Sequence, residues 1–386
     1  MKYLVTGAGG FLGSAIVRQL LARRAGKAIV KPATSGGAGH WAPKLQAGEV
    51  HISTYQRGDY PALAALGVQT FRGDLTDLAA LTQATRGIDI VFHVAAKAGV
   101  WGTYRDYYQA NVLGTQNVIA ACRRNHVRGL VFTSSPSVVF DGTDENGINE
   151  SAPYSQHYLA YYPQTKALAE QAVRAANSPP PHSGADALVG IPPDAVRAAS
   201  TSNLATVSLR PHLIWGPNDP HLIPRILSRA RAGHLRLIGR QDKLVDSTYI
   251  ENAAHAHLLA AAQFAAAGTA APCAGKVYFI SNGEPMTMAD LLARILAVAG
   301  LPPSLPRFSA PLAYLAGATL ELTHSLLHLK QEPLLTRFVA RQLSTAHWYD
   351  LTAARRDLGY HPLVSIDEGM QRLAASLGNH SRKGRV

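Results

Sequence analysis

The strongest constraint on the fold lies in residues 2–24, KYLVTGAGGFLGSAIVRQLLARR, where three glycines separate a short apolar run from an amphipathic stretch. Gly7, Gly10 and Gly13 give the spacing G-x-x-G-x-x-G. In a strand–turn–helix unit the first glycine permits the sharp turn, the second lets the backbone approach a pyrophosphate, and the third lets the helix pack on the strand. The helix N-terminus adds free N–H groups and a positive dipole end. Glycine strings are common, but one in this context predicts a dinucleotide-binding loop.

Strand-like apolar runs recur along the chain and alternate with helical stretches. The runs cover residues 49–56, 68–74, 88–96, 129–135 and 204–216, and the helical stretches include 104–125 and 162–176. Near-continuous apolar strands that alternate with helices are typical of a parallel sheet covered on both faces. We therefore expect an α/β fold, a Rossmann-type doubly wound parallel sheet with a smaller C-terminal substrate-binding lobe.

The same pattern divides the chain into two parts. Residues 1–215 are predicted to form the dinucleotide-binding Rossmann domain, and residues 216–386 mainly the lobe, with some segments returning to the Rossmann core. Two stretches, 25–48 and 178–202, are rich in Gly, Ala, Pro and Ser and break the alternation. We expect both to be mobile surface insertions.

Composition narrows the class of protein. Hydrophobic residues make up 47% and charged residues 16%, as in globular proteins. The net charge of +12 raises the question of acidic partners, but the basic residues fall on predicted helix surfaces and ends, without a basic stripe interleaved with aromatics, so no nucleic-acid partner is expected. Two cysteines, Cys122 and Cys273, are too few for a disulfide framework and indicate a reducing, cytoplasmic location.

The most apolar late stretch, residues 311–329, is interrupted by Glu321, His324 and His328 and is a poor membrane span. No transmembrane segment is therefore expected. The stretch can line an apolar pocket, belong to ordinary core, form a subunit contact or lie on a lipid surface, which leaves peripheral membrane contact open.

The end of the second predicted strand bears on the choice of nicotinamide cofactor. A carboxylate there would accept from the adenine ribose 2′-hydroxyl and favour NAD. The strand ends at Gln56 and Arg57, without an acid in register, and a guanidinium can pair with a 2′-phosphate. We therefore favour NADPH, while Asp59, two residues later, leaves NAD open.

Ser135, Tyr162 and Lys166 are the candidate catalytic residues. Tyr162 and Lys166 lie at i and i+4 on the predicted helix after the strand that ends in serines. A lysine cation one turn away favours the phenolate of a tyrosine, whose ordinary pKa is about 10. Tyr-x-x-x-Lys also arises by chance, and the neighbouring Tyr161 shows how common tyrosine is here; the order of glycine loop, serine-ended strand and helix favours a catalytic set. Ser134 and Ser137 compete with Ser135 as the donor to the substrate oxygen.

The chain resembles the extended short-chain dehydrogenases/reductases, and within them the 3β-hydroxysteroid dehydrogenase-like branch. The resemblance rests on TGAGGFLG, RGDLTD, FHVAAKAGVWG, YQANVLGTQNV, FTSSPSVVFDG, YPQTK, LRPHLIWGPND and VDSTYIENAAHAH, all within residues 1–260. Further similarity, in YFISNGEP and HWYDLTAARRDLGY, extends it nearly to the end of the sequence. The two insertions depart from the usual length of such proteins, but both fall outside these motifs.

The resemblance implies roles for further residues. Asp74 would contact the adenine, Ala95 would lie along the cofactor, and Asn111 would anchor the helix beneath the site and support a proton relay. From the residues alone, Asp74 can instead cap a helix and Asn111 can satisfy backbone groups in a bend. No metal is expected. The expected cofactor-binding residues are Gly7, Gly10, Phe11, Leu12, Gly13, Arg57, Asp74, Leu75, Ala95, Ala96, Lys97, Tyr162 and Lys166.

The resemblance also implies an activity, the NADPH-dependent reduction of a long-chain 2-alkyl-3-oxoalkanoic acid to the 2-alkyl-3-hydroxyalkanoic acid, as in bacterial olefin biosynthesis. Lys97 is a hypothetical partner for the substrate carboxylate, although most surface lysines are merely solvated. A homodimer, with a place in an assembly of pathway enzymes, is expected by analogy. Two alternatives remain: a decarboxylating sterol 4-carboxylate 3-dehydrogenase or 3β-hydroxysteroid dehydrogenase with the same residues, and a dinucleotide-sensing regulator without turnover. The tyrosine–lysine pair argues against the regulator.

Overall fold

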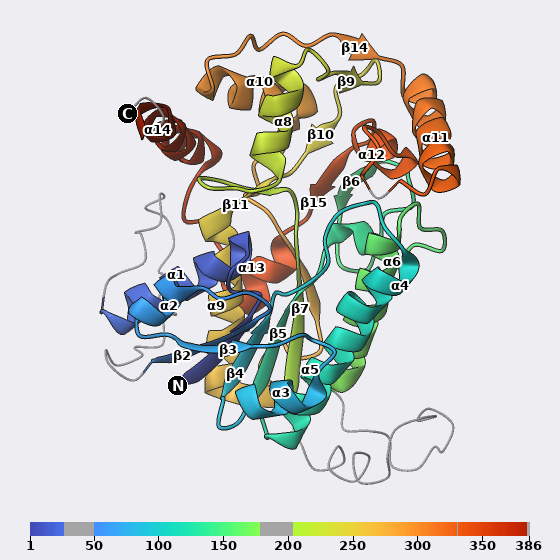
Figure 1. Cartoon of the computed structure of the whole chain (residues 1–386). Coiled ribbons are helices and arrows are strands. Elements are labelled where there is room, and N and C mark those ends of the chain that lie inside the picture. Colours follow the sequence, from blue (N-terminus) through green and yellow to red (C-terminus); the bar gives the residue numbers. More distant parts are fainter. Residues whose placement is uncertain (27–49, 178–203, 330, 384–386) are drawn as a thin grey trace.

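The computed structural model describes residues 1–26, 50–177, 204–329 and 331–383 (Figure 1). The expected insertions 25–48 and 178–202 lie outside the described residues, apart from Ala25 and Gly26 at the end of the first helix.

Seven parallel strands form the central sheet, in the order β12-β7-β5-β4-β1-β2-β3. Most coincide with the predicted apolar runs, which confirms the expected α/β class. The strands are β1 (Lys2–Thr6), β2 (His51–Gln56), β3 (Gln69–Arg72), β4 (Ile90–His93), β5 (Gly129–Thr133), β7 (Ala205–Pro211) and β12 (Val277–Ile280).

Helices cover both faces of this sheet, as a doubly wound fold requires. Alternate residues of β1 show why: Tyr3 and Val5 pack into one hydrophobic core, and Leu4 packs into the other. The first core includes α1 (Phe11–Arg24), α9 (Ile250–Ala267) and α13 (Thr352–Leu358), and the second includes α3 (Leu78–Ala84), α5 (Gly114–Arg124) and α6 (Tyr161–Ala176). A short helix, α2 (Pro61–Ala65), precedes β3.

A smaller lobe lies beyond the sheet and fills the upper part of Figure 1. It contains a second sheet in the order β13-β10-β15-β6 and a small parallel pair, β14 with β9. Its strands are β6 (Glu145–Ile148), β9 (Leu237–Ile238), β10 (Leu244–Val245), β13 (Met286–Thr287), β14 (Arg307–Phe308) and β15 (His347–Tyr349). Its helices are α8 (Leu222–Arg231), α10 (Met288–Val298), α11 (Ala310–Leu326), α12 (Arg337–Gln342) and α14 (Ile366–Lys383).

The chain crosses between the two parts more than once. β6 comes from the N-terminal range yet belongs to the lobe sheet, whereas β12 comes from the C-terminal range and forms an edge of the central sheet. A further parallel pair joins β8 (Ile214–Trp215) to β11 (Thr248–Tyr249), near the place where the chain passes from one part to the other. The short 3-10 helix Gly268–Ala270 follows α9. The division at residue 215 stays a prediction.

The predicted helical stretch 104–125 contains a π-helical segment. It begins as α4 (Tyr104–Tyr107), continues as a π-helix over Tyr108–Leu113, and ends as α5. Such segments often occur at functional sites because they displace a side chain from the regular helical register. Asn111 lies within this one.

The apolar stretch 311–329 forms α11 and the turn after it. Leu315, Leu322 and Leu326 are 61%, 60% and 70% exposed, so ordinary core does not describe these leucines. Among the described residues, no helix combines the length and apolar character needed to cross a bilayer.

Candidate active site

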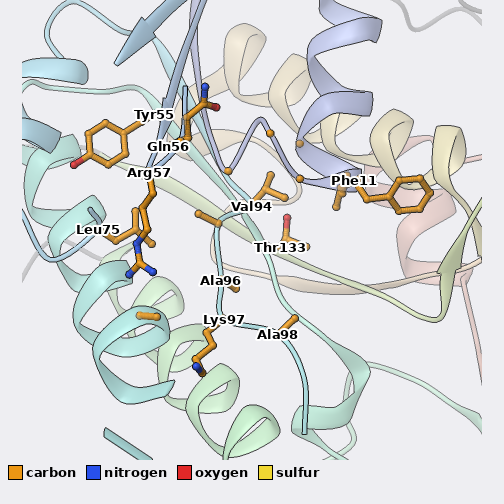
Figure 2. A pocket seen from close by; sticks show the side chains of 18 of the residues that line it. Phe11, Tyr55, Gln56, Arg57, Leu75, Val94, Ala96, Lys97, Ala98 and Thr133 are labelled. Atoms are coloured by element: carbon orange, nitrogen blue, oxygen red, sulfur yellow. The ribbon is translucent and has the colours of Figure 1, made fainter. Parts of the chain in front are cut away.

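A cavity of about 860 Å³ opens at the carboxyl ends of the central strands (Figure 2). Every expected cofactor-binding residue lines it. In Figure 2 the segment from Val94 to Ala98 runs along the cavity, with Arg57 and Leu75 on one side and Phe11 on the other. Asn111 and Ser135 lie outside this lining.

The glycine loop fits a bound dinucleotide. Gly7 has a φ of +71°, and a Cβ there would lie 2.8 Å from the Cα of Ala95. A Cβ on Gly13 would lie 2.3 Å from the carbonyl oxygen of Gly7, so α1 approaches β1 too closely for any side chain. Gly10 is the N-cap of α1 and supplies no side-chain cap, which leaves the first N–H groups of the helix for a phosphate.

The end of the cavity beyond β2 combines a cation and a carboxylate. Arg57 Nε lies 2.5 Å from Asp74 Oδ2. Burial raises the pKa of Asp74, but hydrogen bonds from the backbone and hydroxyl of Thr76, together with Arg57, outweigh it and hold the pKa below its usual value. The N-cap of α3 is Asp77, not Asp74. Asp59 Oδ2 forms an ion pair with Arg72 Nη1 at 3.2 Å, and neither residue lines the cavity.

Tyr60 is a lining residue that sequence analysis missed. The place that a Cβ of Gly9 would take is 2.0 Å from the ring of Tyr60, so the ring lies directly on the glycine loop. Tyr60 is 41% exposed. No local signal marks it, because it follows β2 and reaches the loop only through the fold. Asp219 and His221 likewise reach the cavity only through the fold, and Thr133 lines it from the end of β5.

Asn111 ties the loop after β4 to α6. Its Oδ1 accepts from the backbone N–H of Lys97 at 2.8 Å, and its Nδ2 donates to the carbonyl of Lys97 and to Thr165 Oγ1, both at 3.1 Å. The side chain is almost fully buried. Lys97 Nζ itself lies 3.7 Å from Asp106 Oδ2 at the cavity rim.

A second, smaller pocket of about 240 Å³ adjoins the first. Tyr162 and Ala98 line both. Ser135 and Ser137 line only the smaller pocket, whereas Ser134 faces the larger cavity. The remaining walls come from the segment after β7 and from the lobe, including His212, Leu213, Phe338, Gln342 and Tyr349.

Ser135 is held by its neighbours. It is the N-cap of the 3-10 helix Pro136–Val138, and its hydroxyl accepts from the N–H of Ser137 at 3.3 Å. The two serine hydroxyls lie 2.8 Å apart. Ser135 and Tyr162 both line the smaller pocket. The structure therefore brings the predicted serine and tyrosine together beside the smaller pocket.

Tyr162 and Tyr161 point in different directions. Tyr161 is 47% exposed and packs edge-on against Tyr104, with ring centroids 5.5 Å apart. Tyr162 lies at the junction of the two cavities. Burial raises the pKa of Tyr162 above its usual value, and the neighbouring Ser135 side chain opposes this rise.

Lys166 lines the larger cavity but is only 2% exposed. Its Nζ donates to the carbonyl of Thr133 at 2.5 Å and lies 4.1 Å from the ring centroid of Phe132. Burial lowers the pKa of Lys166 to about 7. Because the ammonium is directed at Thr133 and Phe132, the expected lowering of the Tyr162 pKa is not seen in this arrangement.

Comparison with known proteins places the chain among oxidoreductases. Residues 4–307 match the 3-beta hydroxysteroid dehydrogenase/isomerase family. The chain is 49% identical to a 2-alkyl-3-oxoalkanoate reductase of Shewanella oneidensis, over 97% of this chain and 85% of the relative. A protein of the same name from Stenotrophomonas maltophilia is 46% identical, over 97% of this chain and 99% of the relative.

Lower similarity extends to a sterol enzyme and to solved structures with the same fold. A decarboxylating sterol-4-alpha-carboxylate 3-dehydrogenase of Mus musculus is 33% identical, over 99% of this chain and 92% of the relative. The structure is similar to that of DesIV, a dTDP-glucose 4,6-dehydratase from Streptomyces venezuelae with NAD and TYD bound, with a TM-score of 0.69 and 21% identity, over 99% of this chain and 98% of that one. At this identity the likeness shows a shared fold alone.

Proposed function

This chain belongs to the 3-beta hydroxysteroid dehydrogenase/isomerase family of NAD(P)-dependent oxidoreductases, and from that premise we propose that it reduces a long-chain 2-alkyl-3-oxoalkanoic acid to the 2-alkyl-3-hydroxyalkanoic acid. The observation that carries the proposal is the position of Tyr162, with Ser135 beside it, at the junction of the glycine-loop cavity and the smaller pocket. The two nearly full-length reductase relatives support the choice of substrate class.

The proposed roles follow from this arrangement. The nicotinamide, when bound, supplies a hydride to the carbonyl carbon. Ser135 donates a hydrogen bond to the carbonyl oxygen and stabilises the negative charge that develops there. Tyr162 gives its phenolic proton to the same oxygen, which completes the hydroxyl group. Lys166 lies at the cavity wall one helical turn from Tyr162, where its ammonium would bind the ribose hydroxyls of the nicotinamide half of the cofactor.

We propose NADPH as the preferred cofactor. The fit rests on Arg57, which lies at the cavity edge with its side chain 73% exposed and could exchange its ion pair with Asp74 for one with a 2′-phosphate. Gln56 occupies the end of β2, where a carboxylate would favour NAD. Asp59, the residue that kept NAD open, is paired with Arg72.

The alternative is a dehydrogenase that acts on a sterol 4-carboxylate, with loss of carbon dioxide, or on another 3β-hydroxysteroid. The nearly full-length similarity to the mouse enzyme supports this alternative. The 2-alkyl-3-oxo acid and the sterol 4-carboxylate both carry a carboxyl group on the carbon next to the one that is oxidised or reduced. Oxidation of the 3-hydroxy acid gives a 3-oxo acid, which can then lose carbon dioxide.

A substrate panel separates these proposals. Purified protein is assayed in the oxidative direction with a long-chain 2-alkyl-3-hydroxy acid and with a 4-carboxysterol, each with NADP and with NAD. The proposal requires a higher kcat/KM for the alkyl acid, and a preference for the carboxysterol contradicts it. Cofactor binding without turnover of either substrate would support the regulator. Lys97→Met tests the proposed carboxylate contact, because full activity of this variant on the acid would rule that contact out.

We further propose that the protein is a cytoplasmic homodimer that touches lipid surfaces and takes part in an assembly of pathway enzymes. The buried, free thiols of Cys122 and Cys273 support a reducing location. The exposed leucines of α11 support contact with lipid. Light scattering tests the dimer, and co-purification with other enzymes of the same pathway tests the assembly.

A further inference from the structure

A buried carboxylate lies one turn behind Lys166 on the same helix. Glu170 in α6 is fully buried. Arg210 of β7 donates to both of its oxygens, from Nε to Oε2 at 3.0 Å and from Nη2 to Oε1 at 2.5 Å. The hydroxyl of Tyr154 donates to Oε1 at 2.7 Å. Such a buried ion pair is weak evidence for stabilisation, because apolar residues of similar volume often do as well. The buried pair therefore suggests a role for Glu170 beyond stability.

That role concerns the charge of Lys166. A buried ammonium loses hydration, and hydrogen bonds or a nearby negative charge must compensate for the loss. Lys166 has the carbonyl of Thr133 and the ring of Phe132 on the β5 side, neither of which titrates. Burial lowers the pKa of Lys166, and Glu170 raises it.

The other titratable groups around Lys166 do not supply a negative charge at neutral pH. Tyr162 on α6 keeps its proton, because its pKa is raised. His93 on β4 is neutral, because burial and, to a smaller extent, Lys166 lower its pKa to about 3. Arg210 lies on the far side of Glu170 and carries a positive charge. Among the described residues, Glu170 is the one whose charge supports the ammonium.

We propose that Glu170 is a positioning residue that acts through Lys166: fixed by Arg210 and Tyr154, its carboxylate favours the charged form of Lys166 at the wall of the cofactor cavity. Glu170 lies outside the cavity lining, so its effect passes through the lysine. The inference rests on the proposed function insofar as that function gives Lys166 a catalytic role. The charge balance of the pair, however, can be measured without any substrate.

The expected direction follows from the sign of each charge. Without the carboxylate, Lys166 loses its proton at lower pH. A reaction that needs the ammonium declines as pH rises through the pKa of Lys166, so the alkaline limb of kcat/KM should move to lower pH. A single opposite charge at close range shifts a pKa by about 1–3 units. Because Arg210 lies beyond Glu170 and its positive charge opposes the effect of the carboxylate, we expect a shift of about one unit, at the low end of this range, when both are removed.

The test removes both charges of the ion pair together. Glu170→Gln alone leaves Arg210 buried without its carboxylate and endangers folding. The double variant Glu170→Gln/Arg210→Met leaves no unpaired charge. The pKa of Lys166 is measured by NMR of protein labelled with ε-15N-lysine, without substrate, with the resonance assigned from Lys166→Arg. The same variants are assayed for kcat/KM against pH.

Asp357 provides a matched control. This buried carboxylate of α13 also accepts from a tyrosine hydroxyl and two cations: Tyr278 at 2.8 Å, Lys276 at 3.0 Å and Arg356 at 2.6 Å. It lines neither cavity. We expect Asp357→Asn to lower Tm and to leave the pKa of Lys166 and the alkaline limb in place.

The outcomes are distinct. A fall of about one unit in the pKa of Lys166 in the double variant supports the proposal, and an unchanged pKa in a folded double variant overturns it. Glu170→Asp retains the carboxylate and tests the proposal even where the double variant does not fold. It should keep the pKa of Lys166 within about half a unit of wild type. A full-unit fall would show that the packing of residue 170, and not its charge, sets the pKa of Lys166. If wild type turns over no substrate of the panel, the proposed function fails while the NMR titration still judges Glu170.

Discussion

Two adjacent tyrosines in α6 differ in every property that bears on catalysis. Tyr162 lies between two cavities, beside Ser135, whereas Tyr161 packs against Tyr104 at the surface. Helical geometry causes the difference, because consecutive residues are about 100° apart around the axis. The pair therefore offers a test in which the same atom is removed from two neighbouring side chains.

Tyr162→Phe should abolish turnover while cofactor affinity stays nearly unchanged. Loss of a positioned proton donor costs about 10²–10⁴ in rate. The measurement is kcat for the preferred substrate, together with the Kd of NADPH from fluorescence titration. Tyr161→Phe is the control and should retain full activity. Undiminished turnover by the Tyr162 variant would show that the catalytic assignment is wrong.

Arg57 gives a second test at the level of one side chain. Arg57→Gln removes the guanidinium while the cavity keeps its shape, since the side chain is 73% exposed. We expect kcat/KM with NADPH to fall about tenfold, equivalent to about 1.4 kcal/mol, because a charge-assisted bond to a phosphate is lost. The value with NADH should hardly change. Equal losses with both cofactors would contradict a 2′-phosphate contact.

A site residue can be predicted from the sequence where the pattern that marks it spans only a few positions. Gly7, Gly13, Tyr162 and Lys166, which all line the cavity, could be proposed from the sequence because turn and helix geometry fix their spacing within a few positions. Tyr60 and the Glu170–Arg210 pair carry no such signal. Arg210 meets Glu170 only because β7 lies beside α6 in the finished fold, and sequence spacing contains no information on that contact.

At the level of elements, the glycine loop and α1 act as one unit. The close approach of α1 to β1 needs the absence of a side chain at Gly13, where a Cβ would lie 2.3 Å from the carbonyl of Gly7. The clash involves backbone, which cannot move aside without displacing the helix. Because the same turn presents N–H groups to the cavity, packing and cofactor binding should fail together.

Gly13→Ala is expected to lower Tm and to weaken NADPH binding by at least about tenfold, since overpacking typically costs about 1–3 kcal/mol. Gly378→Ala in α14 is the control, because a Cβ there meets nothing within 4 Å. That change should stabilise the protein by about 0.5–1 kcal/mol through helix propensity. Thermal melts and fluorescence titrations of both variants are the measurements. Normal NADPH affinity in Gly13→Ala would disprove the close-packing account.

Two elements escaped prediction for physical reasons. Periodicity predicted one helical stretch over 104–125, but it does not distinguish a π-helical turn from α-helix, because one extra residue per turn shifts the pattern only locally. β6, with sequence ENGI, is too short and polar to read as a strand, and its partner β15 is some 200 residues away. The long apolar strands of the central sheet gave a much stronger signal.

For the whole molecule, the size of the smaller pocket sets a limit on how the proposed substrate is held. Its volume of about 240 Å³ is below the 300–1,000 Å³ typical of sites that enclose a drug-sized ligand. The pocket can hold the reacting head group, but not two long alkyl chains as well. Each exposed CH₂ group costs about 0.8 kcal/mol in water, so the chains need another apolar surface.

The outer face of α11 is an exposed apolar surface in the same lobe. Leu312, Leu315, Leu322 and Leu326 follow one stripe of the helix and are all exposed. The helix packs on α12, which contributes Phe338 and Gln342 to the smaller pocket. The sequence identified the stretch as apolar but could not tell which side faces solvent, because that depends on how α11 sits on the lobe.

We therefore expect Leu322→Gln/Leu326→Gln to weaken binding to vesicles that contain anionic lipid by about tenfold or more, since a buried leucine side chain contributes about 1.5–3 kcal/mol. The net charge of +12 makes anionic vesicles the natural probe. Tm should stay nearly constant, because both leucines are exposed. Co-sedimentation measures the binding, and Leu66→Gln/Leu244→Gln, at exposed leucines elsewhere, is the control. If vesicle binding persists while light scattering reports a smaller oligomer, the α11 face joins subunits and does not contact lipid.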